Sequence, residues 1–387
     1  MPVIHYLQHF IFRHFAVLTT AIVFVIFSNT AIAQTQGDTI KTFPILERLQ
    51  RQGQTLAPET QKWMKRWYGT NLDAPDFDYQ EISGTSSLNL KVRKKDPTNA
   101  DGYTAYGTYV TLNDSAHFDA EIAYFNLAAI LGHDDIFRPT VRYALGTRAK
   151  QGFKKLLLSM SLAGMDDIRL TNRRAILKEL AKPTPLKGCL KAKKLDSNIA
   201  YDAIANVKRY SPIINNPIIA SLQATNPQPA VSKKLQLLPG YTGNALQLAR
   251  EFSIIMTLDA VFSQWDRYSG GNVVLSKDKF GAAHFYATDN GGTEISRETV
   301  LVKQSLGYFS RYDRHTINQL KILYHFLNQP SRGYLGYTNA EKFVVDLGLY
   351  SEFKPAVYVQ LLKRNLALVL QRVIANEHQF GKNAYLP

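Results

Sequence analysis

The segments of this chain that favour β-strands are concentrated in one region, and this segregation most constrains the fold. Between Glu81 and Val110 the sequence contains short β-prone pieces, LNLKVR and YTAYGTYVTL, separated by glycine and proline. A strongly periodic helix is predicted from Phe118 to Leu131. One further β-prone stretch, TVRYAL, follows Pro139. Strands grouped in this way predict one small sheet rather than a regular alternation of strands and helices.

Helical patterns dominate the rest of the chain. Two amphipathic pieces begin at Pro44 and Pro58, and an apolar helix is predicted from Thr242 to Phe262. The last helix is predicted to begin at Pro355, because apolar residues recur there every three or four positions. Residues 182–240 are rich in proline, asparagine, serine and lysine, which favours an irregular connection.

These patterns predict an α+β protein with two lobes. We expect a helical N-terminal extension in residues 34–80, a small β-rich N-lobe in residues 81–181 and a larger helical C-lobe in residues 182–387. With 387 residues and 45% apolar content, the chain can bury a large core. Its single cysteine, Cys189, excludes an intrachain disulfide framework.

The first 33 residues have the features of a targeting sequence. Residues 1–33 contain no acidic residue, one arginine, an apolar run from Phe15 to Phe27, and then Ala31 and Ala33. This pattern predicts a signal peptide that is cleaved before Gln34, and therefore an exported protein without a stable membrane span after cleavage. An uncleaved anchor is the alternative, because the apolar run approaches the length of a membrane span.

Two short segments carry candidate chemistry: QWDRYSGGN at 264–272 and YATDNGG at 286–292. In each, an aspartate follows apolar or aromatic residues, and small or amide residues come directly after it. Phosphoryl transfer needs one carboxylate to orient the attacking hydroxyl, and a second carboxylate with an amide oxygen to hold divalent metal. Asp266 fits the first role, while Asp289 and Asn272 fit the second. Oxygen ligands of this kind suit Mg²⁺ or Mn²⁺.

A strand lysine and a helix glutamate would complete such a site. Lys91 lies in LNLKVRKK with apolar residues at alternate positions, and Glu121 lies in the first turn of the helix predicted from Phe118. We expect Lys91 to reach the phosphates and Glu121 to position the lysine or the metal. The plainer interpretation is a solvated strand lysine and a glutamate that complements the helix dipole.

At this point a family resemblance becomes visible. The segments AEIAYFNLAAILGHDDIFRPTV, LDAVFSQWDRYSGGNV and TDNGG resemble the secretory-pathway kinase family typified by the Golgi casein kinase and the proteoglycan xylose kinase. WDRYSGGNVVL is more distantly similar to a loop of phosphatidylinositol kinases. The resemblance runs from about Gly84 to Ala375 in one order, and it implies a bilobal protein-kinase-like fold.

The resemblance also implies roles for individual residues. Asp266 corresponds to the catalytic aspartate, Asp289 to the metal-binding aspartate, Lys91 to the nucleotide-binding lysine, and Glu121 to a glutamate that faces the lysine and helps to hold the metal. Gly84 falls in the loop expected to cover the nucleotide. The implied cofactors are ATP with Mn²⁺ or Mg²⁺.

Four positions depart from the family pattern. Val92 stands where the family has proline, Tyr268 where it has histidine, and Gly292 where it has arginine, while Cys189 alone cannot form the family disulfides. None of these changes removes a metal-ligating position, so the departures bear on recognition of the acceptor.

Several functions follow from these observations. The leading interpretation is an exported kinase that phosphorylates a hydroxyl of a secreted protein. A glycan kinase, a lipid kinase and an inactive pseudokinase that serves as activator or scaffold are the alternatives. The net charge of +15 favours phosphate-bearing ligands, anionic surfaces or acidic substrates, and it does not choose among them. Two basic stretches, residues 148–155 and 187–194, either attract an acidic peptide or glycan or are solvated loops. The predicted export argues against nucleic acid as a partner.

Overall fold

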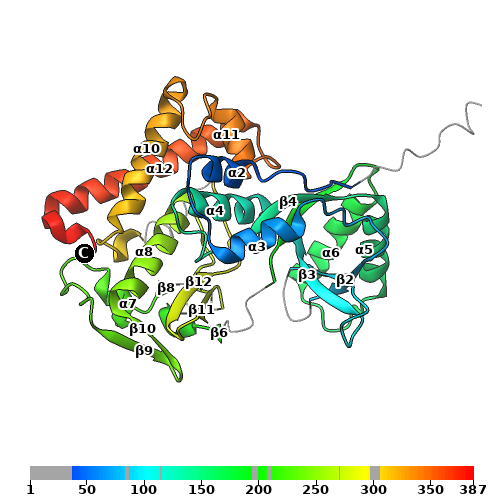
Figure 1. Cartoon of the computed structure of the whole chain (residues 1–387), viewed down its shortest axis with the longest axis horizontal. Coiled ribbons are helices and arrows are strands. Elements are labelled where there is room, and N and C mark those ends of the chain that lie inside the picture. The colour runs from blue at the N-terminus through cyan, green and yellow to red at the C-terminus, as the bar shows by residue number, and fades with distance from the viewer. Residues whose placement is uncertain are drawn as a thin grey trace, which may run out of the picture.

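The computed structural model describes residues 37–82, 87–113, 116–193, 199–206, 211–269, 271–296 and 306–387. The predicted signal peptide, residues 1–33, and Gly84 lie outside the described residues. Two lobes are visible in Figure 1, with a β-sheet on the right, most long helices on the left, and helix α4 between them. This arrangement confirms the predicted α+β, bilobal fold.

The first lobe contains a five-stranded sheet in the order β1-β2-β3-β5-β4, in which all neighbouring strands are antiparallel. Its strands are β1 (Phe77–Glu81), β2 (Leu90–Lys95), β3 (Tyr103–Val110), β4 (Thr140–Leu145) and β5 (Leu186–Lys191). The predicted end of this lobe at residue 181 is therefore too early, because β5 is one of its inner strands. Its sequence, LKGCLK, stands among lysines and prolines that mask the alternation of a strand.

Helices cover both faces of this sheet. The N-terminal extension contains α2 (Pro44–Arg51) and α3 (Pro58–Trp67), as predicted from the two prolines. Between β4 and β5 the chain forms a helical hairpin, α5 (Thr147–Ser159) and α6 (Asp167–Leu180), and α5 packs on β1 and β4. The basic stretch at 148–155 is thus part of a helix rather than a loop. Helix α4 (Phe118–Ile130) packs on β4 and β5.

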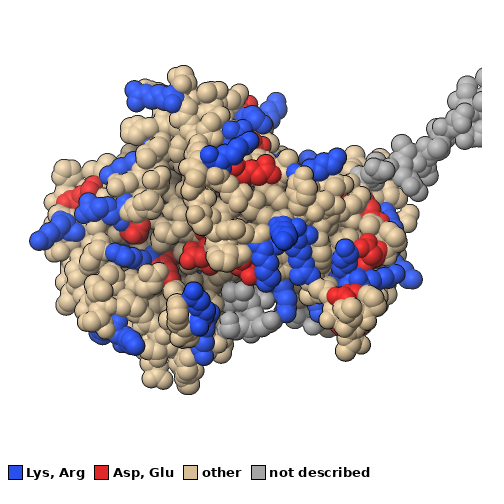
Figure 2. Space-filling model, in the orientation of Figure 1, with Lys and Arg blue, Asp and Glu red and all other residues tan. Residues whose placement is uncertain are grey.

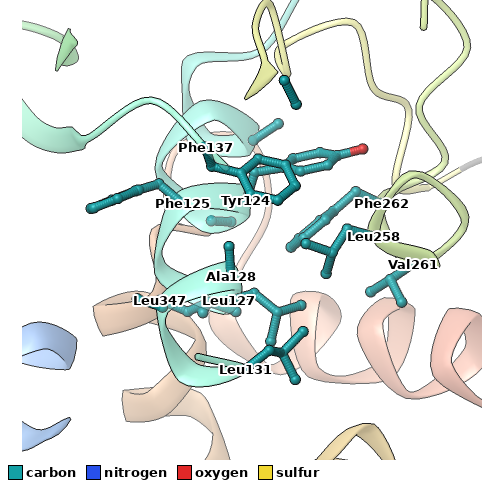
Figure 3. Packing of buried hydrophobic residues seen from close by; sticks show 14 of the residues in the cluster. Tyr124, Phe125, Leu127, Ala128, Leu131, Phe137, Leu258, Val261, Phe262 and Leu347 are labelled. Carbon is teal, nitrogen blue, oxygen red and sulfur yellow. The ribbon is translucent and has the colours of Figure 1, made fainter. Parts of the chain in front are cut away.

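Helix α4 is buried on all sides, including its polar residues Asp119, Glu121 and Asn126. Its bounds agree with the prediction from periodicity. It also contacts α2, α8 and α11, so no face is left for solvent. Figure 3 shows the contact with α8, where the ring of Tyr124 lies 4.5 Å from that of Phe262 between centroids. Helix α4 is therefore the element that joins the two lobes.

The second lobe is mainly helical and also contains short β-hairpins. Its helices are α7 (Pro217–Ser221), α8 (Ala245–Phe262), α10 (Arg314–Asn328), α11 (Ala340–Leu347) and α12 (Pro355–Phe380). Its main strands are β6 (Ile199–Ala200), β11 (Val273–Lys277) and β12 (Ala283–Ala287), with a separate hairpin of β9 (Lys234–Leu238) and β10 (Tyr241–Asn244). The remaining short elements are η1 (Asp202–Ile204), β7 (Ala205–Asn206), β8 (Ser211–Pro212), η2 (Pro330–Arg332) and η3 (Gly381–Ala384).

Local sequence explains where the long helices of this lobe begin. Helix α8 starts three residues later than predicted because Thr242 and Gly243 belong to β10, and the side chain of Asn244 caps the helix by accepting from the backbone N–H of Gln247. Helix α12 begins at Pro355, as predicted. Within the described ranges, no helix is long and apolar enough to cross a membrane.

Candidate functional site

A sharp turn after helix α8 creates the loop that carries Asp266. Ser263 ends the helix in the left-handed region, with φ of 55°, and so redirects the chain. The backbone N–H of Gln264 donates to the carbonyl oxygen of Asp259 at 2.9 Å, which closes the turn. The side-chain oxygen of Gln264 accepts from the backbone N–H of Asp266 at 2.9 Å. These bonds fix the position from which the Asp266 carboxylate extends.

Asn272 closes the other end of the same loop. Its Nδ2 donates to the backbone oxygen of Asp266 at 2.8 Å and to the Asp266 carboxylate at 3.2 Å. Across the described residues, the hydrogen bonds of this side chain all use Nδ2. The amide oxygen of Asn272 is therefore the atom that could coordinate a cation.

The hairpin of β11 and β12 brings the second sequence motif to the first. Val273 pairs with Ala287, so the residues just outside the hairpin are neighbours, and the backbone N–H of Thr288 donates to the carbonyl oxygen of Asn272 at 3.1 Å. Asp289 follows with φ of 49°, a left-handed conformation that aspartate tolerates better than most residues. Its side chain is 56% exposed, so the carboxylate points out of the packed interior.

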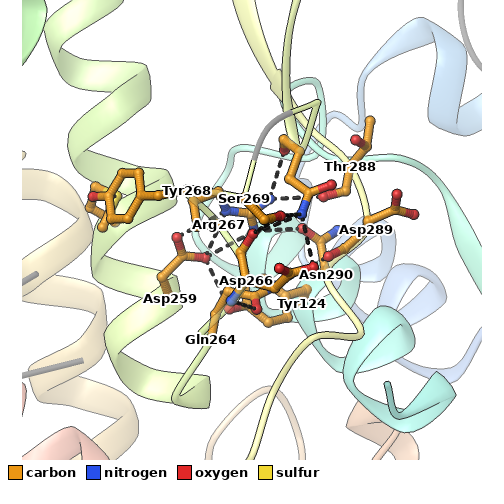
Figure 4. A network of polar contacts seen from close by, with 12 residues as sticks. Tyr124, Asp259, Gln264, Asp266, Arg267, Tyr268, Ser269, Thr288, Asp289 and Asn290 are labelled. Atoms are coloured by element: carbon orange, nitrogen blue, oxygen red, sulfur yellow. Dashed lines mark hydrogen bonds and ion pairs between the residues drawn. The ribbon is translucent and has the colours of Figure 1, made fainter. Parts of the chain in front are cut away.

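Arg267 connects the two loops from inside (Figure 4). Its guanidinium donates to the carbonyl oxygens of Asn272 and Thr288, each at 2.8 Å, and to the side-chain oxygen of Asn290 at 2.8 Å. Its charge is balanced by Asp259, with which it shares three hydrogen bonds of 2.9 to 3.2 Å. Burial lowers the pKa of Arg267, but the Asp259 carboxylate outweighs this effect and the pKa is raised overall. The arginine therefore stays charged.

Two glycines allow the loops to touch. A Cβ atom on Gly292 would lie 2.7 Å from Cβ of Asp266 and 2.8 Å from Oε1 of Gln264. A Cβ atom on Gly291 would lie 3.5 Å from Cγ of Glu121, so this residue borders helix α4. Gly292 also accepts a backbone hydrogen bond from Trp265 at 3.0 Å. The second Gly of the sequence DNGG is thus required by direct contact with Asp266.

Glu121, Lys191 and Asp289 meet at the junction of the sheet, helix α4 and the second loop. Nζ of Lys191 pairs with Oε1 of Glu121 and lies 3.5 Å from Oδ1 of Asp289. The side chains of Lys191 and Glu121 are 2% and 5% exposed. Oε2 of Glu121 is buried and has no hydrogen-bond partner among the described residues. A buried carboxylate oxygen in this state is available to bind a cation or a water molecule.

The environment of Asp266 changes its acidity. Burial raises the pKa of its carboxyl group, and the neighbouring Asp289 carboxylate adds to this shift. Hydrogen bonds from Ser269 and Asn272, and the charge of Arg267, oppose it. A carboxylate with a raised pKa is a better acceptor for a proton than an exposed aspartate. This geometry places two aspartates suited to proton transfer and cation binding near a buried lysine.

Comparisons with known proteins agree with this architecture. The crystal structure of the Golgi casein kinase with Mn and ADP bound matches with a TM-score of 0.51 at 11% identity, over 95% of this chain and 92% of that one. The chain has a protein-kinase-like fold. Hydra Fam20 with sugar gives a TM-score of 0.49 at 12% identity, over 80% of this chain and 88% of that one. A second structure of the Golgi casein kinase gives 0.48 at 12% identity, over 92% and 89%.

By sequence alone, no protein-family model and no curated protein matches the chain.

The kinase-like fold makes the position of the lysine informative. Lys91 lies on β2 and is exposed, and the residue that pairs with Glu121 is Lys191 on β5. The predicted pairing of Lys91 with Glu121 is therefore wrong. Lys91 and Lys191 both lie directly opposite Thr108 of β3, on the same face of the sheet but on different sides of that strand. Of the two strands that carry these lysines, β5 is the one that packs on helix α4.

Thr108 occupies the strand that usually supplies the lysine. In protein kinases the phosphate-binding lysine is on the third strand and pairs with a glutamate of the following helix. Here that strand, β3, presents Thr108, whose hydroxyl accepts from the guanidinium of Arg138 at 3.0 Å. Arg138 is 5% exposed and also donates to the backbone oxygen of Ala192. Lys191 was not predicted as a site residue because its segment has the composition of an irregular connection, although Cys189 and Lys191 stand at alternate positions as in a strand.

The other predicted site residues fall into two groups. Asp266, Asn272 and Asp289 are brought together by the hairpin, and Glu121 reaches Asp289 through Lys191, whereas Gly84 lies outside the described residues. Among the residues that the structure describes, no group of three or more His, Cys, Asp or Glu side chains forms a metal cage. Mg²⁺ in nucleotide sites is commonly held by one or two carboxylates together with phosphates and water, which this arrangement can supply.

Proposed function

We propose that this chain is an ATP-dependent kinase that transfers the γ-phosphoryl group to a hydroxyl of a secreted protein. The observation that carries the proposal is that Lys191 contacts both Glu121 and Asp289. Of these residues, Asp289 lies in the loop that adjoins Asp266. The similarity in fold to the Golgi casein kinase, solved with Mn and ADP, supports the same cofactors for this protein.

Each residue has a defined task in this reaction. Asp266 orients the acceptor hydroxyl and takes its proton as the oxygen bonds to the γ-phosphorus. The bond from that phosphorus to the β,γ-bridging oxygen breaks, and ADP leaves. Lys191 contacts the phosphates in the role first assigned to Lys91.

Asp289 and the amide oxygen of Asn272 are suited to hold Mn²⁺ or Mg²⁺, and the vacant Oε2 of Glu121 provides a further ligand. When bound, the divalent ion neutralises charge on the phosphate oxygens. Lys191 restrains the phosphate chain of the nucleotide, and Asp266 restrains the acceptor. The residues present therefore fit the metal that the fold implies.

Charge supports an acidic acceptor. The net charge is +15, and Figure 2 shows Lys and Arg side chains over both ends of the face that it presents. A positive surface raises the local concentration of acidic partners. A glycan acceptor remains the second candidate, and a panel of acidic proteins and sugar chains would separate the two by which one accepts labelled phosphate.

Nucleotide binding is tested by thermal unfolding of residues 34–387 with ATP and Mn²⁺ or Mg²⁺. A ligand that binds the folded state raises the unfolding temperature. We expect a metal-dependent rise that Asp289→Ala abolishes. No rise with any nucleotide and metal would overturn the proposal and favour a scaffold. Export is tested separately by sequencing the N-terminus of the mature protein, which we expect to begin at Gln34.

A further inference from the structure

Helix α4 is tied to the catalytic loops by a hydrogen bond from Tyr124. The hydroxyl of Tyr124 donates to Oδ1 of Asp259 on helix α8 at 3.0 Å, and the tyrosine is completely buried. Tyr124 stands three residues after Glu121, so the two side chains lie close together along the helix. The helix that presents Glu121 to Lys191 therefore also contacts the second lobe through a polar group.

Asp259 connects Tyr124 to both functional loops through Arg267. The same Oδ1 atom accepts from Nε and Nη2 of Arg267, at 3.2 and 2.9 Å. Arg267 then holds the backbone of Asn272 and Thr288 and the side chain of Asn290. A connected series of buried hydrogen bonds thus runs from helix α4 to the residues on either side of Asp289 (Figure 4).

Burial of these polar and charged groups costs free energy, and apolar side chains of similar size could fill the same volume. Tyr124, Asp259 and Arg267 are each 2% exposed or less, and their neighbours on α8 are apolar. Buried ion pairs are often no more stabilising than apolar side chains of similar size, whereas fully satisfied polar networks specify one arrangement. Within the described residues, none of the three side chains hydrogen-bonds to Lys191 or to the Asp266 carboxylate. Their contribution is to orientation.

We infer that Tyr124, Asp259 and Arg267 are positioning residues that couple helix α4 to the Asp266 and Asp289 loops. Because of this coupling, Glu121 and Asp289 reach Lys191 together, and the metal ligands are assembled only when helix α4 is in place. The inference rests on the proposed function for its catalytic consequence. The coupling itself is a property of the protein without nucleotide.

Tyr124→Phe tests the coupling because it removes only the hydroxyl group. Oδ1 of Asp259 keeps its bonds from Arg267, so the variant should fold. Tyr312→Phe is the matched control: Tyr312 is also buried, its hydroxyl accepts from Asn376 at 2.9 Å, and it lies on a different part of the second lobe. Both variants lose one buried hydroxyl and should unfold at similarly lowered temperatures.

The first measurement is hydrogen exchange without nucleotide or metal. In Tyr124→Phe we expect faster exchange at the backbone N–H groups of Asp266 and Thr288, by about tenfold, since one hydrogen bond to a charged group is lost. Exchange in these two segments should be unchanged in Tyr312→Phe. Unchanged exchange in both variants, or an equal increase in both, would overturn the coupling.

The second measurement is the Mn²⁺ concentration required for half-maximal phosphoryl transfer. We expect Tyr124→Phe to need about tenfold more Mn²⁺, while the control keeps the wild-type value. A wild-type protein that shows no nucleotide effect would refute the proposed function and leave the exchange result to decide the coupling. Normal Mn²⁺ dependence in Tyr124→Phe, with an active wild type, would refute the catalytic consequence of the coupling.

Discussion

Lys191 of strand β5 and Glu121 of helix α4 form an ion pair that is almost completely withdrawn from water, with side chains 2% and 5% exposed. A buried pair of this kind is strongly destabilised when one partner is removed, because the other is left as an uncompensated charge. The pair therefore fixes helix α4 against the sheet at the point where Asp289 approaches the same lysine.

The two lysines on the same sheet face should differ sharply in effect. Lys191→Ala should lower phosphoryl transfer by about 100-fold or more, because a fixed cation at the phosphates is lost. It should also lower the free energy of unfolding by roughly 3–5 kcal/mol, since Glu121 is left unpaired. Lys91→Ala, which removes an exposed lysine, is the control and should change both quantities little. Equal losses in the two variants would show that Lys91 shares the role of Lys191.

Gly292 should not tolerate a side chain. In Gly292→Ala the new Cβ would lie 2.7 Å from Cβ of Asp266, so the aspartate or its loop must move. We expect the free energy of unfolding to fall by about 1–3 kcal/mol because of overpacking. Turnover should also fall below that of the control variant. Gly307→Ala is the control, because a Cβ there meets nothing within 4 Å. Turnover by Gly292→Ala equal to that of the control would argue against the contact.

Asp266 and Asp289 should fail in different ways. Asp266→Ala removes the group that takes the proton, so turnover should fall by about 10²–10⁴-fold while stabilisation by ATP and Mn²⁺ is retained. Asp289→Ala removes a metal ligand and should abolish that stabilisation. Thermal unfolding and initial rates on the same samples separate the two effects. Loss of nucleotide binding in both variants would mean that the roles are assigned wrongly.

His284 should make stability depend on pH. Its Nδ1 lies 2.6 Å from Oε1 of the buried Glu251, and this hydrogen bond, with the charges of Glu251 and Asp278, raises the pKa of His284 to about 9 although burial opposes the shift. The folded protein holds the proton more tightly than the unfolded chain, whose pKa is near 6.5. The resulting stabilisation is complete below the unfolded pKa and is lost as the pH rises through about 9.

His284→Gln should therefore be less stable than the wild type by an amount that shrinks as the pH rises from 6.5 to above 9. Urea unfolding at both ends of this range would measure the difference. His378→Gln, which replaces an exposed histidine near the end of α12, is the control and should lower the stability less at pH 6.5. A difference for His284→Gln that does not change with pH would contradict the assignment.

Local patterns were sufficient for most helices and for the residues of the two loops. Helix α4 and the start of α12 follow from periodicity and from a proline at the helix start, which are properties of neighbouring residues. Asp266, Asn272 and Asp289 could be selected because each stands in a short segment whose residue types suit one chemistry. In contrast, β5 was missed because its alternation spans only six residues within a lysine-rich stretch.

By itself, then, the sequence determined the helical extension, helix α4 and the loop residues Asp266, Asn272 and Asp289, because these depend on residues close together in the chain. Only the tertiary structure decided which lysine pairs with Glu121. Lys91 on β2 and Lys191 on β5 both pair with Thr108 of the strand between them. Lys191 is the lysine that meets Glu121 because the strand order places β5 beside helix α4. Strand order is set by pairing between distant segments and by the burial of a charged pair, and no local pattern records either.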